Sequence, residues 1–329
     1  MTIVVLVNDV QDVRSTQSTA ALAWRAAQAG MALRWTDVAH LGVDAQGQVW
    51  ARCRQAAPSP DPDRWLAACK AATPAVTVLG PGTTVLVRTN PGRDGRRAAL
   101  HDAALAMLAL ARDRGAAVLN DPDGLRQAGS KLFLCRLPSW TRPATIVSAD
   151  PDTLADWVRQ RSEPSILKPL SGTQGTDVFR VTPEDHGNLR QICAVVTRNG
   201  CGIAQAWLPE GFRGDVRLLL VDGGLLEVDG HVAAVARIPG SGEFRSNVAQ
   251  GGRAAAAIIR PRWRRIVDAV GPILRRHGLW LVGLDLVGDH IVEVNVYSPG
   301  GFTDAEAFAG GVDFTGTVLR SLLQHADRS

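Results

Sequence analysis

Two lysines and a set of oxygen-bearing side chains are the residues of this 329-residue chain whose types and spacing could do chemistry. Of its 36 basic residues only three are lysines, namely Lys70, Lys131 and Lys168. Lysine is a compact point charge, whereas arginine is a planar fork. In a chain that uses arginine almost everywhere, a lysine indicates a position that arginine cannot fill. We therefore expect Lys131 and Lys168 to have a function.

Lys168 ends an apolar run and is followed by a loop with two glycines. The segment reads Ile166-Leu-Lys-Pro-Leu170 and continues through Gly172 and Gly175 into another predicted strand. The ammonium group supplies a charge for phosphate oxygens, and the glycines let backbone N–H groups approach the phosphates closely. A plain hairpin with a polar turn is the alternative. The Walker pattern, a glycine-rich loop ending in Gly-Lys and opening a helix, is absent.

Two carboxylates and an amide are predicted to share one face of a hairpin. Asp285 lies in an apolar run at 280–286, and Glu293 and Asn295 lie two residues apart in the next run, 291–296. Residues two apart on a strand share a face, and a tight turn can bring Asp285 to that face. Carboxylate and amide oxygens are the ligands that magnesium takes when phosphates complete its shell. Solvent-facing polar residues are the alternative, but they leave polar groups in so apolar a strand unexplained.

Arginines in a glycine-rich stretch form a candidate anion site. Arg237, Arg245 and Arg253 are separated by glycines and small polar residues, and they could hold carboxylates or phosphoryl groups through paired hydrogen bonds. A surface loop with solvated arginines is the alternative. Asp215 and Arg217 open a predicted strand and point the same way, so a surface ion pair between them is the simplest interpretation.

Strands and helices alternate in the first third of the chain. We expect strands at 3–7, 33–35, 48–52, 85–87 and 117–119, and helices at 16–29 and 98–112. This alternation predicts an α/β domain with a mainly parallel sheet over residues 1–122. The first strand is not followed by Gly-x-Gly-x-x-Gly, so a dinucleotide-binding fingerprint is absent.

The pattern changes for residues 123–329. We expect helices at 124–134, 153–160, 262–276 and 314–323, and strands at 165–168, 178–181, 202–207, 216–221, 225–228, 232–237, 280–286 and 291–296. Short turns join most of these strands, which predicts an α+β and largely antiparallel domain.

Composition excludes several classes of protein. Hydrophobic residues make up 46% and charged residues 21%, an ordinary globular mixture. No apolar run approaches a membrane span, and the N-terminus lacks the basic start of a signal peptide. The scattered arginines and single tyrosine do not form a surface that stacks and binds nucleic acid. The five cysteines fit neither a zinc site nor a disulfide framework, so we expect a cytoplasmic protein with reduced thiols.

Taken in order, these motifs resemble prokaryotic glutathione synthetases, which are ligases with the ATP-grasp fold. The matching stretches include Leu119-Asn-Asp-Pro122, Gly129-Ser-Lys-Leu-Phe133, Asp215-Val-Arg217, Arg245-Ser-Asn247, Gln250-Gly-Gly-Arg253, Val282-Gly-Leu-Asp-Leu286 and Glu293-Val-Asn295. The resemblance covers more than half of the chain. It implies α/β and α+β architecture, with an ATP-grasp fold preceded by a Rossmann-like pre-ATP-grasp domain. The lid subdomain would span about 140–208 and the C-terminal subdomain about 209–329.

The resemblance also implies a role for each candidate site residue. ATP would be bound by Lys131, Lys168, Ser171, Gly172, Thr173, Gln174, Gly175, Gln205, Ala206, Trp207 and Leu208. Asp285, Glu293 and Asn295 would hold magnesium, with manganese as the alternative ion. The reacting phosphate would be contacted by Arg217, Arg237 and Asn295. Substrates would meet Ser18, Arg88, Arg245, Arg253, Ser298 and Gly300.

The implied reaction is ATP-dependent formation of an amide bond. A substrate carboxylate would attack the γ-phosphate and become an acyl phosphate, whose carbon an amine would then attack. The implied substrates are γ-glutamylcysteine and glycine, and the implied assembly is a homo-oligomer of two or four chains. Because the loop at 88–94 and the segment after Pro299 depart from the family's pattern, a related ligase with another acyl donor and amine is one alternative. A non-catalytic ATP-binding protein is another.

Overall fold

The amino-terminal third folds around a parallel sheet. The computed structural model describes residues 1–170, 177–240 and 252–326. Its first sheet has the strand order β2 (Ala32–Asp37), β1 (Thr2–Val7), β6 (Thr83–Val87), β7 (Ala117–Leu119), all parallel. The predicted strands at 3–7, 33–35, 85–87 and 117–119 are therefore confirmed. Nearly all residues of β1 and β6 are buried, as expected for a parallel sheet covered on both faces.

Helices α1 (Ser18–Gln28) and α3 (Ala98–Asp113) cover opposite faces of this sheet. Residues 4 and 6 of β1 belong to the core that includes α3, whereas residues 3, 5 and 7 belong to the core that includes α1. Successive side chains of a strand point to opposite faces, which explains the division. Both helices agree with the predicted spans at 16–29 and 98–112.

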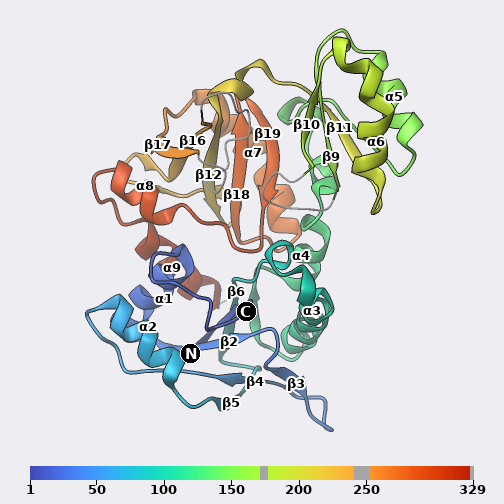
Figure 1. Cartoon of the computed structure of the whole chain (residues 1–329). Coiled ribbons are helices and arrows are strands. Elements are labelled where there is room, and N and C mark those ends of the chain that lie inside the picture. Colours follow the sequence, from blue (N-terminus) through green and yellow to red (C-terminus); the bar gives the residue numbers. More distant parts are fainter. Residues whose placement is uncertain (171–176, 241–251, 327–329) are drawn as a thin grey trace.

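Of a small antiparallel sheet only one strand, at 48–52, was predicted, and the helix next to it was not predicted. Strands β3 (Leu41–Val43), β4 (Val49–Cys53) and β5 (Ala75–Val78) pair in chain order beneath the parallel sheet (Figure 1). Helix α2 (Pro62–Ala71) begins in the proline-rich stretch 58–62, which follows β4. The Asp61 side chain accepts hydrogen bonds from the backbone N–H groups of Asp63 and Arg64, so the same residues that interrupt the chain also cap a helix.

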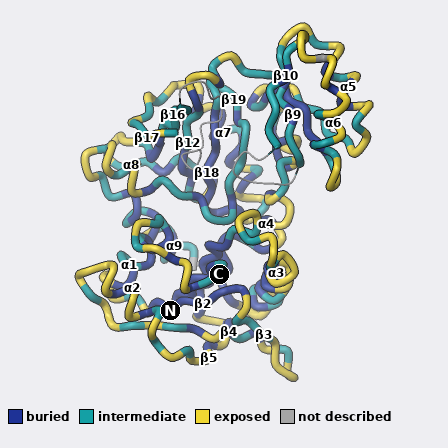
Figure 2. The backbone as a smooth tube through the Cα atoms, viewed as in Figure 1, coloured by how far each residue is buried: buried dark blue, intermediate teal, exposed yellow. Residues whose placement is uncertain are grey.

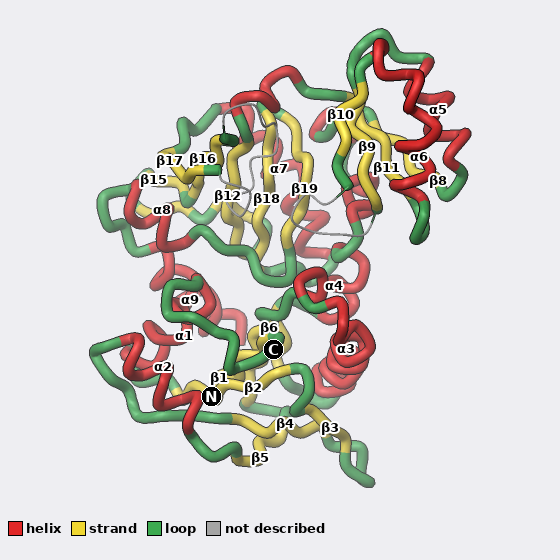
Figure 3. The backbone as a smooth tube through the Cα atoms, viewed as in Figure 1, coloured by secondary structure: helices red, strands yellow, loops and turns green. Residues whose placement is uncertain are grey.

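The middle of the chain forms a separate antiparallel sheet with its own core. Its order is β10 (Phe179–Val181), β9 (Ser165–Pro169), β11 (Gly202–Ala206), β8 (Thr145–Ser148). Helices α5 (Pro151–Arg159) and α6 (Leu189–Thr197) pack on it, at the upper right of Figure 3. Helix α6 was not predicted.

The last part of the chain builds the largest sheet. Its order is β17 (Arg253–Ala256), β16 (Ala234–Ile238), β12 (Asp215–Val221), β18 (Leu281–Val287), β19 (His290–Asn295), with β13 (Gly224–Leu225) also paired to β12. The buried face of helix α7 (Pro261–Arg276) shares a core with β12 and β18. The predicted hairpin of the last two strands is confirmed. Strands β14 (Glu227–Val228) and β15 (His231–Val232) form a short hairpin of their own.

The part built on the parallel sheet and the part built on the largest sheet, called here the two parts of the molecule, are joined through buried contacts. Helices α8 (Phe302–Phe308) and α9 (Phe314–Ala326) return to pack beside α1. Asn120 is buried, and its side-chain amide donates to the carbonyls of Leu281 and Val296 while its oxygen accepts from the Leu281 N–H. Figure 2 shows buried residues along the central strands of both parts.

The predicted helix at 124–134 is wrong in part. Helix α4 (Pro122–Ala128) stops at Gly129, where a Cβ atom would lie 2.8 Å from the ring of Tyr297. Ser130 then accepts a hydrogen bond from the Leu132 N–H and starts a separate 3-10 helix, Lys131–Arg136. This break sets the direction from which Lys131 enters the site.

Candidate active site

Lys131 and Lys168 come from different elements, and the charge of each interacts with the carboxylate of Glu293. Lys168 lies in β9, and Lys131 opens the 3-10 helix that packs against β19. Burial lowers the pKa of both lysines, to about 8 for Lys168, while the negative charge of Glu293 opposes the shift. The charge of Lys131 also lowers the pKa of Lys168. Two ammonium groups near one carboxylate suit a site for phosphates.

The hairpin of β18 and β19 presents Asp285 and Glu293 side by side. The two residues are partners in the strand ladder, and Asn295 follows Glu293 on the same face. Burial and the negative charge of Asp285 raise the pKa of Glu293, so the pair repels. A divalent cation would relieve that repulsion, and the donor set fits magnesium. Within the described residues no third carboxylate, histidine or cysteine joins them, which leaves ligand positions for substrate phosphates.

Two arginines enclose Asp285. Arg217 binds it through two hydrogen bonds of 2.8 Å, and Arg237 Nη2 lies 2.7 Å from its Oδ2 atom. Arg237 also donates to Asp215, at 2.6 Å. Burial acts to raise the pKa of Asp285, but the two guanidinium charges hold it well below its usual range. The simple surface pair of Asp215 with Arg217 is therefore wrong, because each binds a residue on a neighbouring strand.

Arg88 brings an uncompensated charge to the junction between the two parts. Its side chain is 4% exposed, and burial lowers its pKa to about 10. Nε donates to Thr19 Oγ1 and Nη2 to the Pro299 carbonyl, whereas Nη1 is buried with no hydrogen-bond partner among the described residues. Ser18, at the start of α1, accepts from the Gly301 N–H and lies beside Gly300. A buried cation of this kind needs an anion.

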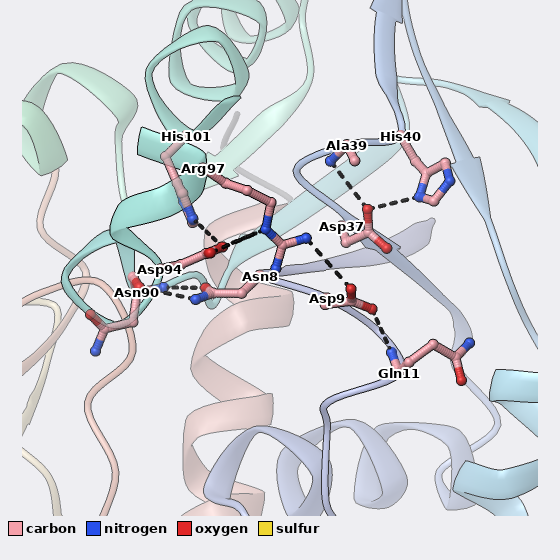
Figure 4. Close-up of polar contacts among 10 residues, drawn as sticks. All are labelled: Asn8, Asp9, Gln11, Asp37, Ala39, His40, Asn90, Asp94, Arg97 and His101. Carbon is pink, nitrogen blue, oxygen red and sulfur yellow. Dashed lines mark hydrogen bonds and ion pairs between the residues drawn. The ribbon is translucent and has the colours of Figure 1, made fainter. Parts of the chain in front are cut away.

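The loop that carries Arg88 is held by a polar network (Figure 4). Asn8 clamps the backbone of Asn90 by accepting from its N–H and donating to its carbonyl. Asp94 accepts from Arg97 and pairs with the buried His101 at 3.0 Å. The side chain of Asn90 points away from Asn8, so the clamp leaves this amide available to the site.

An open hollow lies beside part of this site. It is lined in part by Asn90, Lys131, Glu293, Asn295 and Ser298. Two of the predicted metal ligands, Glu293 and Asn295, thus face a common space with Lys131 and with Asn90 of the loop after β6.

The predicted base-pocket residues lie where the chain leaves the middle antiparallel sheet, the one that contains β11. They end β11 and follow it, and they are Gln205, Ala206, Trp207 and Leu208. Gln205 is buried and donates to Thr145 Oγ1. The Trp207 ring lies 5.0 Å from the ring of Phe212, and the Arg180 guanidinium lies 5.1 Å from Trp207. This aromatic cluster is suited to stacking on a base.

Some predicted site residues are not brought together. Arg253 is exposed on β17, at the edge of the large sheet and three strands from Asp285. Ser171, Gly172, Thr173, Gln174, Gly175 and Arg245 lie outside the described residues.

Sequence reasoning missed the contributions of Thr19, Asn90 and Asn120. Each acts through a contact with a residue far along the chain or through a pocket. The signals present were weak: Asn90 lies in the loop that departs from the family's pattern, and Asn120 lies in a matching stretch.

No helix among the described residues is long and apolar enough to cross a membrane.

Comparison with known proteins agrees with this geometry. Residues 1–126 match the model of the prokaryotic glutathione synthetase N-terminal domain, and residues 130–310 match that of the prokaryotic glutathione synthetase ATP-grasp domain. The chain is 34% identical to glutathione synthetase of Shewanella oneidensis, over 93% of this chain and 92% of that one. It is 40% identical to glutathione synthetase of Xanthomonas campestris pv. campestris, over 68% of this chain and 67% of the other.

Solved structures share the fold at low sequence identity. D-cycloserine synthetase DcsG has a TM-score of 0.63 at 17% identity, covering 97% of this chain and 99% of the other. D-alanyl-alanine synthetase A from Vibrio cholerae has a TM-score of 0.59 at 11% identity, covering 100% and 99%. The ATP-grasp fold expected from the sequence is confirmed. The chain therefore belongs to the prokaryotic glutathione synthetase family and is an ATP-dependent carbon–nitrogen ligase of the glutathione synthetase type.

Proposed function

We propose that this ligase joins γ-glutamylcysteine to glycine, using ATP and magnesium, and so makes glutathione. The observation that supports this most is a charge cluster: Lys131 and Lys168 both interact with Glu293, which pairs with Asp285 in one hairpin, and Lys131 and Glu293 line a common hollow. The substrates are those implied by the name that the relatives share.

We assign the nucleotide phosphates to Lys131, which lines the hollow, and to Lys168. Their ammonium groups bind and orient the phosphates, and Gln205, Trp207 and their neighbours receive the base. Asp285, Glu293 and Asn295 hold magnesium, which when bound neutralises phosphate charge. Arg217 and Arg237 stabilise the negative charge on the transferring phosphoryl group. These residues supply position and charge, and none of them forms a covalent bond.

We assign the acyl substrate to the junction beside Arg88. Its unpaired Nη1 group, with Ser18, Ser298 and Gly300 close by, provides donors for a carboxylate that does not react. The reacting carboxylate forms a bond to the γ-phosphorus while ADP leaves. The amine nitrogen then bonds to the acyl carbon, phosphate leaves, and the nitrogen loses a proton. Exclusion of water protects the acyl phosphate.

We also propose a wider organisation for the chain. Residues 1–122 form the pre-ATP-grasp domain, and the separate core at 145–206 supports a lid subdomain at about 140–208. The edge strand β5 exposes Val76 and Val78, at 64% and 49%, which supports a homo-oligomer of two or four chains. All five cysteines are free, which is consistent with a cytoplasmic enzyme.

Amine-dependent ADP release tests this function. We expect release with γ-glutamylcysteine plus glycine, and little with either alone. A panel of other γ-glutamyl dipeptides and amino acids tests the acceptor and donor, and preference for another pair would refute glutathione as the product. Lys168→Ala should lower turnover at least about hundredfold, whereas Lys70→Ala, which removes a lysine that binds the Gln11 carbonyl, should not.

A further inference from the structure

Asp285 is a proposed metal ligand whose carboxylate is already bound by two arginines and an asparagine in the described structure. Oδ1 accepts from Arg217 Nε at 2.8 Å. Oδ2 accepts from Arg217 Nη2 at 2.8 Å, from Arg237 Nη2 at 2.7 Å and from Asn295 Nδ2 at 3.0 Å. The Asp285 side chain is 1% exposed. Oδ2 therefore has no lone pair left for a metal ion, and burial of the side chain restricts the approach of an ion to Oδ1.

Charge makes this arrangement stable in the absence of ligands. A buried carboxylate beside a second carboxylate needs positive charge, and here two guanidinium groups supply it. Arg217 and Asp285 are partners in the ladder of β12 and β18, so the bidentate contact is built into the strand register. The side chains of Arg217 and Arg237 are only 17% and 16% exposed, which strengthens each pair.

We propose that Arg217 and Arg237 act as built-in counter-ions that exclude a divalent metal from Asp285 until nucleotide phosphates draw them away. This inference rests on the proposed metal site. Metal and arginine compete for the same oxygens, and the γ-phosphate offers the guanidinium groups an alternative anion. The free enzyme therefore binds divalent metal weakly, and the metal enters together with the nucleotide.

Asp215 completes this exchange as a positioning residue. It holds Nε of Arg237 at 2.6 Å while Nη2 of the same guanidinium holds Asp285. If Asp285 binds the metal, Arg237 loses its contact with Asp285 but keeps its hydrogen bond to Asp215. The guanidinium group can then rotate about that remaining contact. Its charge thus stays beside the reacting phosphate.

A titration of the free enzyme with Mn²⁺ tests the inference. The loss of the EPR signal of the free ion measures how much is bound. We expect weak binding by the wild-type enzyme and at least about tenfold tighter binding by Arg217→Met, because a charge-assisted contact no longer has to be broken. Arg237→Met should give a smaller gain and serves as a second variant if Arg217→Met does not fold. Arg264→Met, which removes an exposed arginine paired with Glu227, should bind like the wild type.

The double variant Arg217→Met/Asp285→Asn shows whether the gained binding uses Asp285, and we expect it to lose the gain. The inference is overturned if the wild-type free enzyme binds Mn²⁺ as tightly as Arg217→Met. It is also overturned if neither arginine variant gains affinity. Either result leaves amine-dependent ADP release unaffected, so this inference and the proposed function fail separately.

Discussion

Single side chains in this site carry charges that their burial disfavours. Burial lowers the pKa of Lys168 to about 8 and that of Arg88 to about 10, and it raises the pKa of Glu293. A shift of this kind means that the charged form is less stable in the folded chain than in water. The charges are kept because ligands use them, and their removal should therefore affect stability and activity in opposite directions.

The affinity for ATP should fall as the pH rises through about 8. Lys168 is mostly protonated at pH 7 and mostly neutral at pH 9, so the dissociation constant should rise about tenfold over that interval. Calorimetric titration with ATP measures it. Lys168→Arg keeps its charge across this range and should give a flat profile, so an equally steep fall in that variant would assign the pH dependence elsewhere. In the ligand-free wild type, stability should rise between about pH 8 and the ordinary lysine value of 10.5, because the unfolded chain holds the extra proton there.

Glu293→Gln should remove activity and raise stability. The substitution deletes a proposed metal ligand, which should lower kcat at least about hundredfold. It also removes a half-buried negative charge that Asp285 repels, so the thermal midpoint should not fall and is expected to rise. Coupled ADP release and thermal denaturation measure the two effects. Glu227→Gln, at an exposed pair with Arg264, is the matched control, and a Glu293→Gln enzyme with near-normal turnover would refute the assignment.

Arg88→Met should weaken binding of the acyl substrate and leave binding of ATP unchanged. Loss of a buried charged donor should raise KM for that substrate by about tenfold to a hundredfold, while the dissociation constant of ATP stays constant. Initial-rate kinetics with each substrate varied in turn measure this. Arg93→Met changes an exposed arginine of the same loop and should have little effect. A shift in ATP affinity equal to the shift in KM would place Arg88 in the nucleotide site.

At the scale of elements, periodicity predicted most of what is long or strongly apolar. The two parallel-sheet helices and the β18–β19 hairpin follow directly from it. Helices α6 and α8 were missed because they are short, at nine and seven residues, although α6 buries Leu189, Cys193 and Val196 at helical spacing. The expected strands at 225–228 and 232–237 each break in two, at Leu226 and Ala233, because these residues bond to each other and to Leu219 across the turn.

The site could be predicted only where its residues are close in the chain. Spacing alone placed Glu293 and Asn295 on one face. The pairing of Arg217 with Asp285 depends on β12 lying between β16 and β18, a strand order that no local pattern contains. The approach of Lys131 to Glu293 depends in the same way on how a 3-10 helix packs against β19.

Packing of α4 against the end of α7 should be sensitive to one atom. A Cβ atom at Gly124 would lie 1.9 Å from the His277 carbonyl oxygen, so Gly124→Ala must displace one of the two helices. We expect a loss of about 2 kcal/mol or more in the free energy of unfolding, as for other overpacked sites. Urea denaturation measures it. Gly80→Ala, where no atom lies within 4 Å of the added group, should be nearly neutral, and equal stabilities of the two variants would contradict the packing.

At the scale of the whole molecule, the site exists only when its two parts are docked. Arg88 reaches Pro299 from the first part, and Asn120 reaches Leu281 of β18 and Val296, which follows β19. In the docked arrangement, Asn90 of the loop after β6 and Glu293 line the same hollow. Contacts at this junction should therefore affect stability and substrate binding together.

Asn120→Ala tests this coupling. The substitution leaves two buried carbonyls and one buried N–H without their partner, and each such group costs roughly 1–3 kcal/mol. We expect the free energy of unfolding to fall by about 3 kcal/mol or more, together with a rise in KM for the acyl substrate, which bridges the two parts. Urea denaturation and initial-rate kinetics measure these effects. Asn188→Ala, at an exposed position before α6, should change neither. A destabilised Asn120→Ala enzyme that keeps the wild-type KM would show that the junction supports the fold without shaping the substrate site.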